Sequence, residues 1–283
     1  MSEPQLPPKS RSPLKAKPMR QPGQSLGERR RDLFEDYLLF PVLLAATFGV
    51  MALMRWMEVR SGVVHSPWLY TGIFTFALAF LVFRFIRILP LLRNLRQGEA
   101  GEKIVGEYLE RLRERGYRVF HDVLGDGFNL DHAIIGPAGV FTLETKTWSK
   151  PERGEPRIEF DGEALRVLGG QPDRSPIIQA RARAGWLRLL LEESTGRKFK
   201  VHPVVLVPGW FIDSSAQRDW STWVLEPKGL PKWLKDDPAK LLPEDVQLAA
   251  YHLSRYVRSH EQEKERIERS FWHAMRRKPI KLD

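Results

Sequence analysis

The sequence predicts an α/β domain, built on a mixed central sheet flanked by helices, that follows a two-helix transmembrane hairpin. Two uncharged apolar runs, residues 38–54 and 68–83, predict the hairpin. An apolar helical pattern at residues 102–112 and two strands around a Gly-Pro-Ala-Gly turn at 136–139 predict the domain. Later segments supply further elements: a hairpin at 157–168, strands at 200–208 and 220–225, and a helix over 243–257.

Each apolar run is near the short end of what a bilayer requires. At 1.5 Å per residue the runs cover roughly 24 to 26 Å, and flanking residues can extend them. Aromatic and arginine side chains stand where interfacial belts form: Tyr37, Trp56, Trp68, Tyr70, Arg84 and Arg87. The alternative is a buried helical hairpin in a soluble core, but no amphipathic partner for so much apolar surface follows nearby.

Basic residues predict the orientation of the hairpin. Eight lysines and arginines precede the first run and four follow the second within residues 84–96, whereas the loop at 55–67 has two. Positive charge stays in the cytoplasm, so both termini are expected there, in the inner (cytoplasmic) membrane. We expect a disordered basic leader (1–36), the hairpin (37–90, with spans at about 38–54 and 67–84), the α/β domain (97–259) and a charged tail (260–283).

The segment from Asp131 to Lys146, DHAIIGPAGVFTLETK, carries the chemistry. Side chains alternate along a strand, so Glu144 and Lys146 share a face while Thr145 points to the other. Antiparallel pairing across the turn brings Asp131 to the same end. Two carboxylates and a lysine therefore converge.

These residue types suit phosphodiester hydrolysis. A hard cation such as Mg²⁺ or Mn²⁺, held by one or two carboxylates, neutralises charge on the phosphoryl oxygens and activates water. Lysine adds a compact positive charge beside the reacting phosphate. The alternative is a hairpin whose acidic and basic end is merely solvated, because Glu-x-Lys on a strand is common.

From Gly98 to about Trp148 the sequence resembles the nuclease-related domain NERD, a branch of the PD-(D/E)XK nuclease superfamily. The matching residues are Gly98, Gly101-Glu102, Val105, Leu109, Leu112, Tyr117 to Val123, Asp131-His132, Gly136-Pro137, Gly139-Val140-Phe141 and Glu144-Thr145-Lys146. The match continues through Ser175 to Gln179 and, more loosely, His202 to Pro208, with Ser-Pro where the family usually has Asn-Pro. Both Ser and Asn cap helices, so the local structure is expected to hold.

This resemblance implies a restriction-endonuclease-like fold and Mg²⁺- or Mn²⁺-dependent cleavage of nucleic acid, with DNA favoured over RNA. It implies Asp131, Glu144 and the Thr145 carbonyl as metal ligands, and Glu102, Lys146 and Gln179 as further site residues. The other class of function consistent with it is a catalytically degenerate domain that binds nucleic acid or acts as a membrane scaffold. The intact Asp131, Glu144 and Lys146 favour the nuclease.

Helical spacing selects Glu102 over Glu107. Glu102 is followed at three, seven and ten residues by Val105, Leu109 and Leu112, so it is expected to lie on the apolar face of the helix. Glu107 is expected to lie on the solvent-exposed face. The alternative for Glu102 is an acidic residue in a first helical turn, which the helix dipole favours.

Gln179 is also expected to face inward from its helix. Ala182 and Trp186 follow it at three and seven residues, which predicts an inward face. The resemblance implies that this place on the helix lies beside the metal site. The alternative is an amide that hydrogen-bonds backbone.

Other chemistries are excluded or disfavoured. The chain has no cysteine, which excludes disulfides and thiolate catalysis, and its seven histidines lack the spacing of a zinc site. His132, next to Asp131, is expected to point to the other face of its strand and to be packed. No Walker motif is present, and the apolar runs carry no central charge of the kind a transporter uses.

Overall fold

The computed structural model describes residues 19–62, 66–151, 154–167, 170–217, 219–236 and 240–276. Its α-helices are α1 (Gln24–Phe34), α2 (Phe40–Arg60), α3 (Trp68–Glu110), α4 (Ser175–Thr195), α5 (Leu230–Asp236) and α6 (Pro243–Arg276). A π-helical turn, Glu35–Leu39, joins α1 to α2, and short 3-10 helices span Arg111–Arg115 and Pro227–Gly229. The strands are β1 (Arg118–Leu124), β2 (Asn129–Gly136), β3 (Gly139–Thr145), β4 (Arg157–Phe160), β5 (Leu165–Val167), β6 (Val201–Leu206), β7 (Phe211–Asp213) and β8 (Trp223–Leu225).

The main sheet is mixed, as the sequence predicts. Its strand order is β1-β2-β3-β6-β8, with antiparallel pairs from β1 to β3 and parallel pairs from β3 to β8. The parallel crossover from β3 to β6 runs through α4, the usual way to join parallel strands. A small second sheet, β5-β4-β7, contains the predicted hairpin around Asp161-Gly162.

Helices cover both faces of the main sheet. On one face, Val105 and Leu109 of α3 pack with Phe141 and Leu143 of β3. On the other, α4 and α6 pack against β1 to β3 in a second cluster that includes Leu187, Leu191, Ala249, Leu253 and Val140. Burial of these apolar faces, at about 25 cal/mol per Å² removed from water, holds the layers together.

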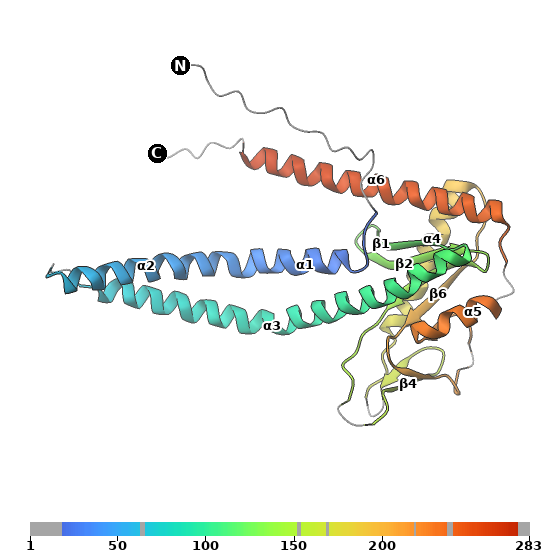
Figure 1. Ribbon diagram of the computed structural model, residues 1–283, viewed down its shortest axis with the longest axis horizontal. Coiled ribbons are helices and arrows are strands. Elements are labelled where there is room, and N and C mark those ends of the chain that lie inside the picture. Colours follow the sequence, from blue (N-terminus) through green and yellow to red (C-terminus); the bar gives the residue numbers. More distant parts are fainter. Residues whose placement is uncertain are drawn as a thin grey trace, which may run out of the picture.

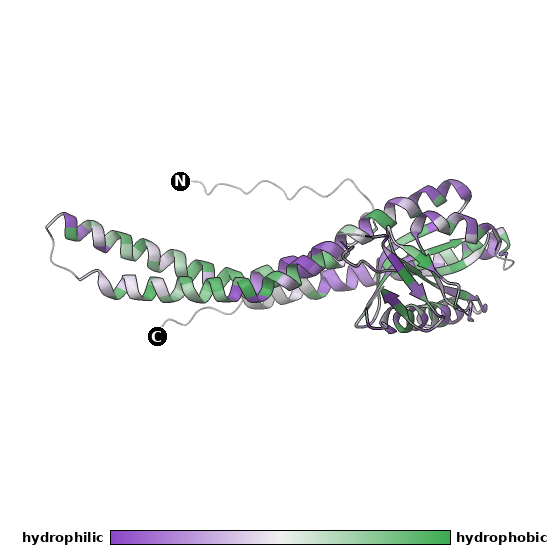
Figure 2. Ribbon diagram, turned by 90° about the horizontal axis from the view of Figure 1, so that it is seen from below, coloured by the Kyte–Doolittle hydropathy of each residue, from purple (hydrophilic) through white to green (hydrophobic). Residues whose placement is uncertain are grey.

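A long helical hairpin projects from the domain (Figure 1). Helices α2 and α3 are long and apolar enough to cross a membrane, and the hydropathy colouring is mostly green and white over the outer part of this hairpin (Figure 2). They pack on each other where Gly49 faces the Phe74 ring, and the Trp56 indole donates to the Thr71 hydroxyl at 3.1 Å. Much of their outer apolar surface stays uncovered; Phe76 is 75% exposed.

Helix α3 does not stop at the end of its apolar run. The whole helix is 43 residues long and runs through Pro90 to Glu110, so one helix is both the second candidate span and the first helix of the domain. The sequence suggested two separate helices. Residues 91–110 contain no second proline, and the stripe from Glu102 onward continues the same helix.

The disordered leader is wrong for residues 19–36. Residues 24–34 form α1, which packs along α3, and the side chain of Arg20 is buried. Residues 1–18 lie outside the described residues. The segment is ordered by ion pairs with the domain, which a composition poor in apolar residues does not reveal.

His132 is packed, as expected, and forms a chain with His121. Its Nδ1 lies 2.8 Å from the His121 Nδ1, and the His121 Nε2 lies 2.9 Å from the Glu110 carboxylate. Because the carboxylate accepts from His121 Nε2–H, the His121 Nδ1 accepts from the His132 Nδ1–H. Burial lowers the pKa of both imidazoles below 6.5, that of His132 farther.

This pair makes the stability of the domain pH-dependent. The two imidazoles bind protons more readily in the unfolded chain than in the folded one. The stability that the neutral pair contributes is therefore present above about pH 6.5 and is lost as the pH falls below that value. We expect up to about 1.4 kcal/mol of stability lost per pH unit for each histidine. Thermal unfolding at pH 7.5 and 5.5 measures it. The His121→Asn/His132→Asn variant should show a flatter pH slope, whatever its absolute stability; an unchanged slope contradicts the assignment.

Candidate active site

The register of β2 and β3 brings Asp131 and Glu144 together. His132 faces Leu143 in this antiparallel ladder, so the next pair outward is Asp131 and Glu144. The Thr145 N–H donates to Asp131 Oδ2 at 2.8 Å, which fixes this carboxylate at the end of β3. The convergence of the two carboxylates follows from the hairpin.

A third carboxylate, which sequence reasoning missed, extends this line onto β1. Asp122 stands between the paired residues His121 and Val123 and therefore opposite Asp131. Its φ of 50° takes it out of the regular ladder. Asp122, Asp131 and Glu144 thus form a carboxylate row across three neighbouring strands. Like charges in neighbouring cross-strand positions repel, so the row needs positive partners.

Two arginines flank the carboxylate row. At one end, Arg20 Nε donates to Asp122 Oδ2 at 2.8 Å, and both side chains are 2% exposed. At the other, the Arg183 guanidinium of α4 forms a close ion pair with Glu144. Asp131, in the middle, has no such direct partner among the described residues beyond the Thr145 N–H. The carboxylate at the centre of the row is therefore held by a backbone N–H and not by a direct ion pair.

Glu102 enters from α3, on the layer opposite α4. Gly101 allows the helix to approach the end of β3 closely, because a Cβ there would collide with the Thr147 side chain. Glu102 is 7% exposed beside buried Val105 and Leu109, while Glu107 is exposed, so the predicted helix phase is confirmed. Since Glu102 is deep inside α3, the first-turn alternative does not apply.

Burial and mutual repulsion raise the pKa values of three of these carboxyls. Burial raises the pKa of Glu102 to about 9, and the charge of Asp131 adds most to that rise. Burial and Asp131 likewise raise the pKa of Glu144 to about 8, against the lowering effect of Arg183. Burial raises the pKa of Asp131 to about 6, opposed by Arg183 and the Thr145 N–H. This site favours additional positive charge.

Lys146 follows the end of β3 and shares the face of Glu144. Its N–H donates to the Leu206 carbonyl at 2.9 Å, which holds the backbone in line with β6. Its ammonium lowers the pKa of both Asp131 and Glu144 and lies 5.9 Å from the Trp148 ring centroid. The structure therefore brings together Asp131, Glu144 and Lys146.

The inward orientation predicted for Gln179 is wrong. Gln179 and Ala182 are exposed, and α4 instead buries Ile177, Ala180, Ala184, Leu187 and Leu191. Those five residues recur every three or four positions, a signal that the sequence offers for the correct phase. Arg183 lies one turn after Gln179 on the same side of α4 and makes the contact with Glu144.

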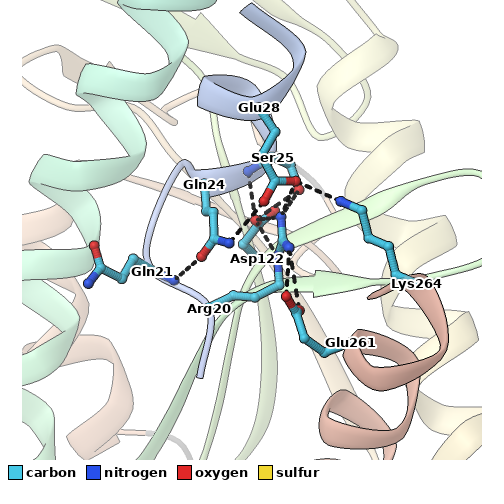
Figure 3. A network of polar contacts seen from close by, with 8 residues as sticks. All are labelled: Arg20, Gln21, Gln24, Ser25, Glu28, Asp122, Glu261 and Lys264. Carbon is cyan, nitrogen blue, oxygen red and sulfur yellow. Dashed lines mark hydrogen bonds and ion pairs between the residues drawn. The ribbon is translucent and has the colours of Figure 1, made fainter. Parts of the chain in front are cut away.

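An amino-terminal arm, residues 19–28, lies against Asp122, which is the end of the carboxylate row farther from Arg183 (Figure 3). Arg20 also donates to Ser25 Oγ and Glu28 Oε2, each at 2.9 Å, and Lys264 of α6 reaches Glu28 at 2.7 Å. The Gly23 N–H hydrogen-bonds the Glu102 carboxylate. Pro22 fills the space that Gly106 leaves open on α3. The arm thus contacts two of the acidic residues near the site.

The side-chain oxygens at this site are of the type that a hard divalent cation binds. Asp131 and Glu144 offer carboxylate oxygens, and Mg²⁺ commonly takes only one or two protein carboxylates with water as its remaining ligands. Among the described residues, no group of three or more His, Cys, Asp or Glu side chains is arranged to hold a metal ion. In this geometry the Arg183 guanidinium partly supplies the positive charge that a cation would bring to Glu144.

Comparisons with known proteins identify one family that part of the chain matches. Residues 97–208 match the model of the nuclease-related domain family, NERD. An uncharacterized protein of Bacillus anthracis is 40% identical over 57 residues, which cover 18% of this chain and 27% of that protein. The chain thus spans about a quarter of that relative's length. No solved structure matches the chain. The matched segment contains Glu102, Asp131, Glu144, Lys146 and Arg183; residues 97–208 are a nuclease-related domain.

Proposed function

We propose that this protein is a membrane-anchored, divalent-metal-dependent nuclease that hydrolyses phosphodiester bonds of nucleic acid, DNA in preference to RNA, at the cytoplasmic face. The observation that carries the proposal is the meeting of Asp131 and Glu144, both under-neutralised, with Lys146 at one strand end of a nuclease-related domain. The two apolar helices support the anchoring.

The roles of the residues follow from their positions. Asp131, held by the Thr145 N–H, and Glu144 would bind Mg²⁺ or Mn²⁺ together with the Thr145 carbonyl. When bound, the ion would activate water and polarise the phosphoryl group. Lys146 stabilises the negative charge that grows on the phosphoryl oxygens. Arg183, half-buried beside Glu144, is placed to contact a phosphate once a cation neutralises that carboxylate.

The test is a cleavage assay with the full chain purified in mild detergent. Labelled single- and double-stranded DNA and RNA are incubated with Mg²⁺, with Mn²⁺ or with a chelator. We expect products only with a divalent ion and faster cleavage of DNA. Equal cleavage in chelator, or none with any substrate, would count against the nuclease.

A second candidate is a non-cleaving domain that binds nucleic acid or serves as a membrane scaffold. The Arg183–Glu144 ion pair favours it, because an internal cation then takes the place of a metal at that carboxylate. In this case the purified chain binds the same oligonucleotides equally well in chelator and yields no product. Calorimetry would detect no binding of Mg²⁺ or Mn²⁺.

Glu102 and Glu107 give a matched pair of variants on one helix. Glu102→Gln should reduce metal-dependent cleavage by about tenfold or more, since its carboxyl is close enough to be perturbed by Asp131. Glu107→Gln changes an exposed side chain and should leave the rate within about twofold. Cleavage rates of the two variants under one metal concentration measure the difference. Equal losses would place Glu102 outside the site.

The orientation of the hairpin can be measured separately from activity. Cysteines introduced singly at Gly62 and at Asn129 should react differently with a membrane-impermeant thiol reagent in spheroplasts, because the native chain has none. We expect labelling at position 62 and protection at position 129 until the membrane is opened. The reverse pattern would put the nuclease-related domain outside and remove its access to the cell's DNA.

A further inference from the structure

A cavity between α1 and α3 lies apart from the carboxylate row, on the side of the domain that faces the hairpin. Its volume is about 990 Å³, and its walls come from the amino-terminal arm, α1 and residues 89–103 of α3. Figure 1 shows α1 running along the part of α3 that lies between the α2–α3 hairpin and the domain. The cavity is therefore next to the part of the chain proposed to leave the membrane.

The cavity has an excess of positive charge. Five basic side chains line it: Arg30, Arg31, Arg93, Arg96 and Lys103. The two carboxylates in its walls are already engaged, since Glu99 pairs with Arg30 at 3.2 Å and Lys103 at 2.7 Å, and Glu28 pairs with Arg20 and Lys264. Within the described part of the chain, Arg31, Arg93 and Arg96 have no acidic partner. Three arginines thus face a shared space without counter-ions.

Apolar side chains line the same cavity. Phe34, half-exposed at the end of α1, and Leu89 and Leu92 of α3 belong to its walls. Tyr37, three residues after Phe34, stacks with the Arg84 guanidinium at 4.7 Å, and Arg87 stacks with Phe83 at 4.9 Å. Such aromatic and arginine pairs are typical of the membrane–water interface. Phe34 and Leu89 thus lie close to the proposed membrane–water interface, and the unpaired arginines lie farther from the membrane, toward the domain.

A ligand that fits this cavity carries negative charge next to a hydrocarbon part. We propose that the cavity binds the headgroup of an anionic phospholipid from the cytoplasmic leaflet, with the phosphate between Arg31 and Arg93 and the glycerol and first acyl carbons against Phe34 and Leu89. This site rests on the membrane anchoring proposed above, and not on nuclease activity. Basic clusters just inside a membrane helix bind anionic lipids in this way. Nucleic acid would use the arginines but not the apolar wall.

The experiment uses the full chain, delipidated and reconstituted in nanodiscs or in mild detergent. Native mass spectrometry counts phosphatidylglycerol and phosphatidylcholine molecules retained as lipid is titrated. We expect a saturable phosphatidylglycerol adduct that phosphatidylcholine does not replace. Arg31→Gln/Arg93→Gln should weaken it by roughly 25-fold, from about fivefold per basic side chain near an anionic surface. Both positions are exposed, so the fold should be retained; circular dichroism checks this.

The matched control removes two charges outside the cavity, as Arg29→Gln/Arg111→Gln, both at exposed positions. Retention of the lipid by this control supports the site, and an equal loss in both variants overturns it in favour of diffuse attraction. Displacement of the lipid by millimolar inorganic phosphate or by a soluble DNA duplex, with the same dependence on Arg31 and Arg93, also overturns it. Insertion without a preference for anionic lipid overturns this site alone, whereas failure to enter nanodiscs overturns the anchoring as well.

Discussion

Asp131→Asn and Glu144→Gln are each expected to abolish metal-dependent cleavage, with rates reduced by at least about 10³-fold. A Mg²⁺ ion keeps several waters and relies on one or two protein carboxylates, so loss of either removes a main contact. Asp131 is in the middle of the carboxylate row, and both Glu102 and Glu144 have its charge as their strongest carboxylate neighbour. The amides keep the size of the side chains, and the amide oxygen introduced at position 131 can still accept the Thr145 N–H.

Two measurements on each variant separate chemistry from folding. Calorimetry with Mn²⁺ should show the loss of binding, and circular dichroism should show the native helix content. Asp126→Asn, in the exposed turn between β1 and β2, removes the same charge and should cleave at the wild-type rate. Wild-type cleavage by Asp131→Asn would remove the carboxylate row from the mechanism and direct attention to another part of the domain.

Lys146→Ala is expected to lower turnover by about 10² to 10³ while leaving metal binding intact. The ammonium acts on charge that develops in the transition state, and the loss of one such electrostatic contact typically has this size. Its position beside Asp131 and Glu144, with the backbone fixed by Leu206, keeps that charge near the reacting phosphate. The effect should therefore appear in kcat, with little change in the concentration of Mg²⁺ needed for half-maximal rate.

Lys150→Ala provides the matched control. Lys150 is exposed four residues along the same segment, so its replacement removes an equal charge from the same surface. The expected effect is confined to a small change in substrate affinity that high salt suppresses. If both lysines lowered turnover equally, Lys146 would contribute to general attraction of nucleic acid and would have no role at the reacting phosphate.

The central part of the fold was predictable because its patterns are local. Alternation along 131–146, the turn at 136–139 and the stripe from Glu102 to Leu112 follow from nearest-neighbour geometry, and the observed β2–β3 register and α3 phase confirm them. The continuity of α3 was less visible, because a change from apolar to charged residues does not by itself end a helix.

The parts of the site that sequence reasoning missed depend on distant contacts. Asp122 joins the carboxylate row with a backbone φ of 50°, a conformation that no local sequence pattern predicts here. Arg20 is buried by partners from three elements, α1, β1 and α6, and two of these lie far from it in the sequence. The orientation of Arg183 was predictable from local spacing, because the apolar residues of α4 define its buried face. The assignment of Ala182 and Trp186 to that face gave the helix the wrong phase.

The arm around Arg20 also has a consequence for the order in which the molecule is assembled. Arg20 and Asp122 are 102 positions apart, and Arg20 and Glu261 are 241 apart. The Glu28–Lys264 contact spans 236 positions. Translation delivers the arm before α6, so these bonds cannot close until α6 has been made, after the two apolar helices have emerged. The arm, although it precedes both apolar helices in the sequence, therefore reaches its final contacts only after α6 is made, and a chain that ends before α6 lacks Glu261 and Lys264.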